Sequence, residues 1–211
     1  MRTDDIITLL VADLPNCPPD TGALLRRWWP IAAAAAGAGF LAVSGVRADL
    51  LSSGLAPTVM KITLGLLIAI VSIVGAFRLS RPEVTASVAA NGLFAIVVFL
   101  GIIIATDTWI HGLDSWRARL FGKSILPCLT LIPLLAALPL AASLMALRRG
   151  ATTGPAAVGA LAGLASAGLA IVAYGLFCTE DSPMFIAVWY SLAAVVVGFV
   201  GAVLGRMLLK W

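Results

Sequence analysis

The three cysteines are the side chains of this 211-residue sequence that could most readily do chemistry. Cys17 lies in the stiff, proline-rich stretch 15–19 and is interpreted as an incidental free thiol. Cys128 lies near the start of one apolar run, and Cys178 lies at the end of the next run. The loop between these runs is centred near residue 151. In an antiparallel helical hairpin the depths of the two thiols would therefore differ by only about 6 Å, at 1.5 Å per residue.

Two thiols at similar height on neighbouring helices have two chemical uses. They can close a disulfide in an oxidising compartment, or they can hold a soft metal ion as thiolates. A third interpretation is that they are two small apolar fillers that match in depth by chance. The lack of a Cys-x-x-Cys motif makes a membrane thiol oxidoreductase a weaker interpretation. We predict that Cys128 and Cys178 form a functional pair, either as a disulfide or as ligands of a soft metal ion.

His111, the one histidine in the sequence, lies in the predicted loop 107–124 and is a further candidate metal ligand beside the two thiols. Its alternative interpretation is an imidazole at the membrane interface without a ligand. The sequence contains no Gly-x-Ser-x-Gly, no His-Glu-x-x-His and no phosphate-binding loop. We therefore predict that the protein is not an enzyme and uses no cofactor.

Residues 3–14 have the pattern of a short amphipathic helix. Thr3 is a good N-cap, and Asp4 and Asp5 suit the positive end of the helix dipole. The apolar residues that follow recur at helical spacing until Pro15: Ile6, Ile7, Leu10, Val11 and Leu14. A helix of this length is marginal alone in water, so it lies either on a membrane or in the groove of a partner. Its acidic residues disfavour an anionic membrane surface, which favours a protein partner.

Apolar helices must position these residues. The chain is 61% hydrophobic and 11% charged, with a mean hydropathy of +1.07, whereas soluble domains are roughly 25% charged. Apolar runs, each long enough to cross a bilayer core, lie at about 28–46, 60–77, 88–106, 125–147, 155–177 and 184–205. The pattern predicts an all-α, polytopic integral membrane protein: a six-transmembrane-helix bundle over 28–211, after an N-terminal segment of residues 1–27.

Ionisable residues are almost absent from the predicted spans, which disfavours an ion-coupled transporter. Lys61 lies at the edge of the second span, where its aliphatic stem could snorkel outward. A small membrane transporter or channel remains the alternative function. Gly159 with Gly163, and Gly201 with Gly205, form two Gly-x-x-x-Gly pairs that allow close helix packing, which we expect inside one bundle rather than between two copies.

The basic residues predict the orientation, because Lys and Arg are enriched in cytoplasmic loops. Nine of them lie on the side of the termini and five on the other side. We therefore expect a multi-pass protein with both termini in the cytoplasm. The net charge of +4 then reflects topology, and we expect no direct nucleic-acid binding. The first 27 residues lack the layout of a cleavable signal peptide, so we expect them to be retained.

The order of landmarks along nearly the whole chain resembles the NrsF family of membrane anti-sigma factors. The opening Met1–Ile7 with Leu9 and Leu10 is similar to the start of that family. The later landmarks follow in family order: Gly45–Leu50, Pro57 with Lys61, Arg81-Pro82, Cys128, Pro133, Pro139, Pro155, Tyr174 with Cys178, Trp189-Tyr190 and Trp211. Two positions depart from the family pattern, because Phe177 stands where a histidine is frequent and Glu83 where a glycine is frequent.

The resemblance implies a protein of the bacterial inner membrane with a role in transcription regulation and stress response. Its partners would be the lipid bilayer and an extracytoplasmic-function (ECF) sigma factor, sequestered by the cytoplasmic N-terminal segment. The implied sigma-binding residues are Thr3, Asp4, Asp5, Ile6, Ile7, Leu9, Leu10 and Leu14. The resemblance also implies that Cys128 and Cys178 sense periplasmic metal ions or oxidants and release the sigma factor. Phe177 removes a potential metal ligand and favours a thiol–disulfide mechanism.

Overall fold

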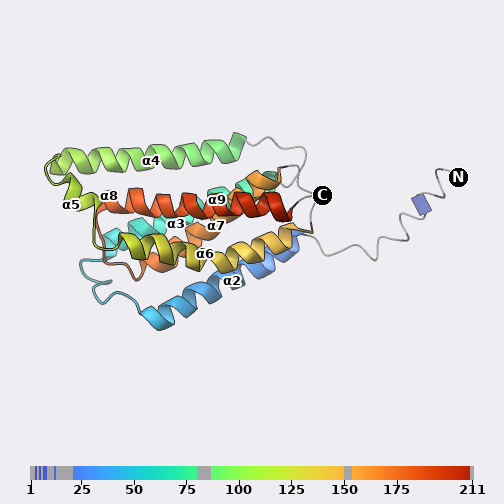
Figure 1. The fold of residues 1–211 in the computed structure, drawn as a ribbon, viewed down its shortest axis with the longest axis horizontal. Coiled ribbons are helices and arrows are strands. Elements are labelled where there is room, and N and C mark those ends of the chain that lie inside the picture. Colours follow the sequence, from blue (N-terminus) through green and yellow to red (C-terminus); the bar gives the residue numbers. More distant parts are fainter. Residues whose placement is uncertain are drawn as a thin grey trace.

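The computed structural model describes residues 21–79, 87–149 and 154–209, together with Thr3, Asp5, Ile7, Thr8 and Ala12 near the start. The described part of the chain is helical and contains no strand. Its elements are α2 (Thr21–Ser44), α3 (Leu55–Leu79), α4 (Ser87–His111), α5 (Trp116–Leu120), α6 (Ile125–Leu147), α7 (Pro155–Gly175), α8 (Pro183–Phe185), the π-helix η2 (Ile186–Tyr190) and α9 (Ser191–Leu208). The long helices run side by side in one bundle (Figure 1). The all-α prediction is confirmed for these residues.

Five helical segments are long and apolar enough to cross a membrane: Leu55–Leu79, Ala90–His111, Trp116–Leu147, Pro155–Gly175 and Pro183–Leu208. They correspond to the second to sixth predicted spans. α2, which contains most of the first predicted span (28–46), is not among them. Arg26 and Arg27 interrupt its apolar sequence, and much of the rest is alanine and glycine. The sixth span therefore stays a prediction.

Several helix boundaries differ from the apolar runs, because backbone hydrogen bonding continues through polar residues. α2 begins at Thr21, inside the segment predicted as the tail, and ends at Ser44. α4 continues to His111, so part of the predicted loop 107–124 is helical. The rest of that loop contains the short helix α5.

α7 occupies the centre of the bundle, and 67% of its most apolar 18-residue stretch is buried. Its small residues allow backbone contact on two sides. A Cβ atom at Gly163 would lie 2.5 Å from the carbonyl oxygen of Val197 in α9. A Cβ atom at Gly168 would lie 2.5 Å from the carbonyl oxygen of Gly65 in α3. The Gly-x-x-x-Gly pairs thus pack α7 against α9 within one chain, as the sequence predicted.

α4 lies at the edge of the bundle (Figure 1). Only 17% of its most apolar 18-residue stretch is buried. Phe94, Val97, Phe99 and Ile102 leave large apolar side chains exposed on this helix. An exposed apolar surface of this kind marks contact with a membrane or a partner. In a membrane protein it is the surface that faces lipid.

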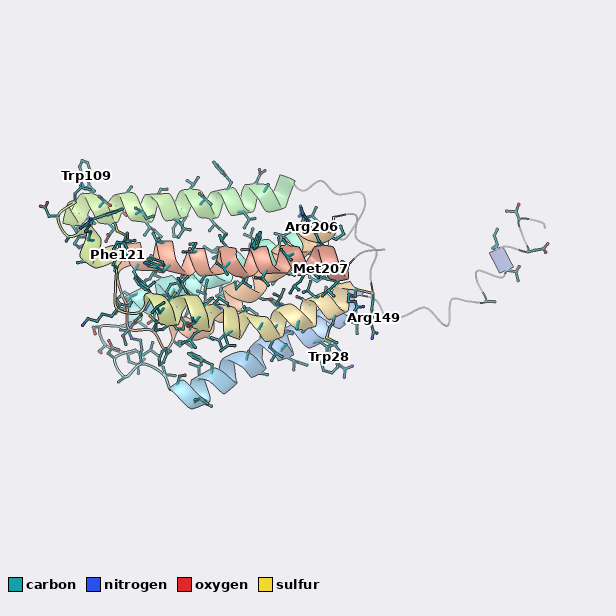
Figure 2. All side chains as sticks on the ribbon, viewed as in Figure 1. Trp28, Trp109, Phe121, Arg149, Arg206 and Met207 are labelled. Carbon is teal, nitrogen blue, oxygen red and sulfur yellow. The ribbon has the colours of Figure 1, made fainter. Side chains whose placement is uncertain are left out.

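The two ends of the bundle are distinct. Trp28, Arg149, Arg206 and Met207 lie at the end where α2 begins and α9 finishes, whereas Trp109 and Phe121 lie at the opposite end (Figure 2). Below, the first is called the tail end and the second the loop end. The loop end contains the α2–α3 connection, α5 and the 176–182 segment between α7 and α8.

Candidate functional site

Cys128 and Cys178 are both buried at the loop end of the bundle. Cys128 lies on the first turn of α6, and Cys178 follows the end of α7, where its N–H donates to the carbonyl oxygen of Tyr174 at 2.9 Å. Their exposed fractions are 0% and 3%, and both thiols are free. Cys17 lies outside the described residues. The thiol pair is therefore shielded from water by the bundle.

The two thiols share their surroundings with two phenols and one ammonium group. Cys128, Cys178, Tyr174 and Tyr190 belong to one cluster of buried side chains, and the ammonium group of Lys61 donates to the carbonyl oxygen of Cys178. The ring centroids of Tyr174 and Tyr190 lie 5.7 Å apart. The hydroxyl of Tyr190 is buried without a hydrogen-bond partner among the described residues. Tyr190 ends η2, and π-helical turns of this kind are frequent at functional sites.

The structure corrects the prediction that the side chain of Lys61 snorkels outward. This side chain lies on α3 and is 0% exposed. Its ammonium group donates to the carbonyl oxygen of Cys178 at 2.8 Å and to Oδ1 of Asp181 at 3.1 Å. A buried cation needs such partners, since desolvation is costly without them.

Arg47 completes the same cluster from the loop between α2 and α3. Its guanidinium group makes two bonds to Asp181, at 2.7 and 2.8 Å, and two to Asp49, at 2.8 and 2.7 Å. Nη1 also donates to the carbonyl oxygen of Cys178 at 3.3 Å. The side chain of Arg47 is 1% exposed, whereas Asp181 is 35% and Asp49 42% exposed. The cluster therefore places two buried cations behind two half-exposed carboxylates.

The electrostatics of the cluster are those of satisfied ion pairs. Hydrogen bonds from Arg47 lower the pKa of Asp49 to about 2 and hold the pKa of Asp181 below its usual range. Hydrogen bonds to Asp181 and Asp49 raise the pKa of Arg47 above its ordinary value. Below, the four side chains Arg47, Asp49, Lys61 and Asp181, with the carbonyl group of Cys178, are called the Cys178 clamp.

The 176–182 segment connects the clamp to several other elements. The backbone N–H of Arg47 donates to the carbonyl oxygen of Leu176 at 3.1 Å. Glu180 accepts a bond of 2.7 Å from the backbone N–H of Lys123, just before α6. The indole of Trp189 donates to the carbonyl oxygen of Leu120 in α5 at 2.7 Å. Cys178 thus lies in a short segment that contacts α3, the α2–α3 loop and the turn before α6.

His111 belongs to a different cluster at the same end. Its Nδ1 lies 3.1 Å from the carbonyl oxygen and 3.4 Å from the carboxylate of Asp107, and Asp107 pairs with Arg119. Among the described residues, no three histidine, cysteine, aspartate or glutamate side chains converge to hold a metal ion. The candidates Cys128, Cys178 and His111 therefore do not form a common metal site in this arrangement.

The predicted sigma-binding segment is described only in part. Thr3, Asp5 and Ile7 are helical and exposed, while Asp4, Ile6, Leu9, Leu10 and Leu14 lie outside the described residues. The exposed fraction of Ile7 is 53%, so an apolar side chain is available there. The role of this segment stays a prediction.

Sequence reasoning missed the clamp. Arg47 and Lys61 are two of the five basic residues on the side away from the termini, and the sequence assigns them no role beyond the orientation. It assigns no role to the side chains of Asp49 and Asp181. Arg47 and Asp181 are 134 residues apart, so no local spacing connects them. One available signal was that a lysine in an apolar helix needs a partner, because an unpaired charge there is costly.

Comparison with known proteins gives full-length matches. A family model described as "NrsF: Negative regulator of sigma F" matches residues 10–211. The "Anti-sigma-F factor NrsF" of Caulobacter vibrioides is 33% identical over 229 residues, which cover 100% of both chains. The "Probable anti-sigma-F factor NrsF" of Azospira oryzae is 34% identical over 217 residues, again covering 100% of both chains. No solved structure matches the chain.

Proposed function

The chain belongs to the NrsF family of negative regulators of sigma F, and from this premise we propose that it is a membrane anti-sigma factor for an ECF sigma factor. The family is regulatory rather than catalytic, and its name implies a sigma factor as partner. The observation that carries the proposal is the match over the full length of two relatives named as anti-sigma-F factors. Five apolar helices of membrane-spanning length support a membrane location.

In the proposed mechanism, the N-terminal segment holds the sigma factor at the membrane and away from RNA polymerase. The apolar residues of positions 6–14 would fill a groove on the sigma factor, which is a common way to bind an amphipathic helix. The exposure of Ile7 supports this role. α2 begins at Thr21, seven residues after Leu14, and belongs to the bundle.

The bundle would lie in the bacterial inner membrane with six spans and both termini in the cytoplasm. α2 begins, and α9 finishes, at the same end of the bundle, which fits an even number of crossings (Figure 1). Arg149 and Arg206 lie at this end, as the enrichment of basic residues in cytoplasmic loops requires (Figure 2). The loop end, with its thiols, would then face the periplasm.

Cys128 and Cys178 would sense oxidants or soft metal ions from the periplasmic side. In the oxidative case, the two thiols lose two protons and two electrons to a thiol oxidant and form one S–S bond. Two thiolates could instead bind a metal ion, but the described residues offer no third His, Cys, Asp or Glu ligand beside them. Phe177 stands next to Cys178 and cannot coordinate. The ligand set therefore favours the disulfide as the signalling step.

The alternative, a small transporter or channel, lacks a supporting observation. Arg47, Lys61 and Asp107 are the buried charged residues in the described part of the chain, and all three lie toward the loop end. Along the centre of the bundle, α7 contacts its neighbours through backbone atoms at Gly163 and Gly168. These features fit a packed regulatory bundle better than a polar pathway.

The test of the proposal is whether the full-length membrane protein co-purifies with a sigma factor through its tail. Leu10→Asp, alone and with Ile6→Asp, places carboxylates on the apolar face of the tail. We expect loss of the co-purified sigma factor and constitutive expression of its target promoter, while the membrane protein accumulates normally.

Ala12→Asp is the matched control, because it adds the same charge outside the apolar set of the tail. It should leave the sigma factor bound. If Leu10→Asp and the double variant repress as well as the wild-type protein, the tail is only a leader and the transporter class gains support.

A further inference from the structure

Building on the function proposed above, we infer that the Cys178 clamp couples the thiol pair to α2, so that breaking the clamp releases the sigma factor. Arg47 and Lys61 would be positioning residues for the signal: they touch neither the sigma factor nor the oxidant. The inference rests on the contacts of the clamp, on the attachment of Arg47 to α2 and on the packing beneath the start of α2.

The first step concerns residue 178 itself, which carries both the thiol and the clamped carbonyl group. Lys61 and Arg47 donate to this carbonyl oxygen at 2.8 and 3.3 Å. Closing a disulfide brings two sulfur atoms to about 2.05 Å, more than about 1 Å closer than non-bonded contact. The bond from Arg47 is already near the limit for a hydrogen bond. If disulfide formation displaces the carbonyl group of Cys178 from Arg47 by a few tenths of an ångström, this bond breaks.

The Cys178 clamp cannot open gradually. The side chains of Arg47 and Lys61 are 1% and 0% exposed, and both also bind Asp181, which lies in the same 176–182 segment as Cys178. Both cations must keep this carboxylate when the segment moves, because leaving a buried charge without its partner is strongly unfavourable. The loop that carries Arg47 must then move as well, which gives the two distinct arrangements that a switch requires.

The third step links the clamp to α2. Arg47 follows the end of α2 at Ser44 after a turn at Gly45, whose φ of 77° is in the left-handed region that glycine adopts readily. The backbone of Arg47 is also tied to Leu176. Phe40, on the last turns of α2, packs edge-on against Phe177, with ring centroids 5.4 Å apart. The end of α2 and the loop that follows it therefore contact Phe177 and Leu176, the two residues just before Cys178.

The fourth step concerns the other end of α2, where the tail begins. An apolar cavity of about 250 Å³ lies beneath its first turns. Leu25, Trp29 and Pro30 of α2 line one side, and Phe77 and Leu147 are among the residues opposite. α2 is thus connected to buried ion pairs through Arg47 at its loop end, and it borders a half-open apolar pocket at its tail end. A helix supported in this way can change its tilt when the clamp opens.

The experiment measures the sigma factor that co-purifies per molecule of full-length membrane protein, with and without the thiol oxidant diamide. Arg47→Gln removes the charge that joins Asp49, Asp181 and Cys178. We expect sigma retention to fall at least about fivefold without diamide, which is the low end of ordinary allosteric coupling. Alkylation with a maleimide should show that Cys128 and Cys178 are still free thiols. Arg47→Gln would then release the sigma factor although no disulfide has formed, as expected of a variant that mimics the oxidised state of the clamp.

Two further variants separate coupling from misfolding. Asp181→Asn keeps the shape of the side chain while weakening the bonds to both cations, so it should also release the sigma factor. Arg117→Gln is the matched control, because Arg117 lies on α5 at the same end and is exposed. It should retain the sigma factor and respond to diamide like the wild-type protein.

The decisive comparison places Arg47→Gln in a chain that also carries Cys128→Ser and Cys178→Ser. Release should persist relative to the same chain with Arg47, because the clamp acts after the thiols. Loss of the effect in this background would mean that Arg47 acts on thiol chemistry, and would overturn the inference. Normal retention and normal diamide response in both Arg47→Gln and Asp181→Asn would also overturn it, while leaving the anti-sigma function intact. A wild-type protein that holds no sigma factor would overturn both.

Discussion

At the scale of single residues, Cys178 contributes both its side chain and its backbone carbonyl group to the candidate site. Its thiol is buried beside Cys128, and its carbonyl oxygen accepts bonds from two buried cations. In the proposed function, this thiol would react with oxidants that reach the end of the bundle, and any displacement of the residue would act on the bonds of its carbonyl group. Arg47 and Lys61 supply the strength of that second connection, because bonds to charged groups are stronger than neutral ones.

The first residue-scale prediction concerns the thiols. Cys128→Ser and Cys178→Ser should each abolish the response of the target promoter to diamide, because one thiol cannot form the bond alone. The double variant should resemble each single variant, since residues that act as one unit are not additive. Promoter activity measured with and without diamide checks this.

Cys17→Ser is the control for that measurement, because Cys17 is expected on the reducing side of the membrane. It should respond normally. If Cys128→Ser and Cys178→Ser also respond normally at normal protein levels, the pair only fills space. If they merely lower protein levels, the thiols are structural and His111 becomes the next candidate sensor.

The second residue-scale prediction concerns pH. Arg47 lowers the pKa of Asp49 to about 2 and holds the pKa of Asp181 below its usual range. Each carboxylate therefore contributes stability above its unfolded pKa of about 4, and this contribution is lost as the pH falls through the lower folded value. Thermal unfolding of the protein in detergent should show a decrease in Tm from pH 5 to pH 3.

Asp181→Asn should make this decrease smaller, because the variant has lost one of the groups that titrate. Its Tm at pH 7 should be lower than that of the wild-type protein. Identical slopes for the two proteins between pH 5 and pH 3 would show that the clamp carboxylate contributes nothing to stability.

At the scale of elements, the packing of α7 shows which part of the sequence pattern carries structural information. The small residues at Gly159, Gly163 and Gly201 predict close approach, and the structure places them between α7 and α9. Gly65 and Gly168 bring α3 and α7 into equally close contact. The sequence does not predict this contact, because neither residue belongs to a Gly-x-x-x-Gly pair. Spacing within one helix is visible in a sequence, whereas the choice of partner helix is not.

The element-scale prediction tests this packing. Gly163→Ala would place a Cβ atom 2.5 Å from the carbonyl oxygen of Val197 and 3.0 Å from the Cα atom of Gly198. Two backbones would have to separate, so we expect a loss of about 1–3 kcal/mol in the free energy of unfolding, as for other overpacked sites. Thermal unfolding in detergent measures the effect.

Gly101→Ala is the matched control on α4, where an added Cβ atom meets nothing within 4 Å. Alanine is a better helix former than glycine, so this variant should be at least as stable as the wild-type protein. If Gly163→Ala unfolds at the same temperature as Gly101→Ala, the contact between α7 and α9 is not as tight as the structure has it.

At the scale of the whole molecule, most helices follow from apolar runs, because backbone groups in a bilayer must be satisfied within each span. The clamp does not follow from them. Lys61 and Asp181 are 120 residues apart, and Lys61 and Cys178 are 117 apart, so only the folded bundle brings them together. The position of both thiols at one end of the bundle could be predicted, because two adjacent antiparallel helices relate depth to sequence position. The partners of its carbonyl group could not, because they come from α3 and a distant loop.

The last prediction tests the orientation of the whole molecule, on which the meaning of both ends depends. α2 begins and α9 finishes at the same end, together with Arg149 and Arg206 (Figure 2). We propose that this end lies in the cytoplasm, because six crossings would bring both termini to one side and basic residues are enriched in cytoplasmic loops. A reporter that is active only in the cytoplasm should therefore work when it is fused after Trp211, whereas a reporter active only in the periplasm should be silent there. The same periplasmic reporter inserted after Gly112, in the turn between α4 and α5, should be active, because this turn lies at the loop end. A periplasmic signal after Trp211 would place the thiols on the cytoplasmic side and remove periplasmic sensing from the proposed function.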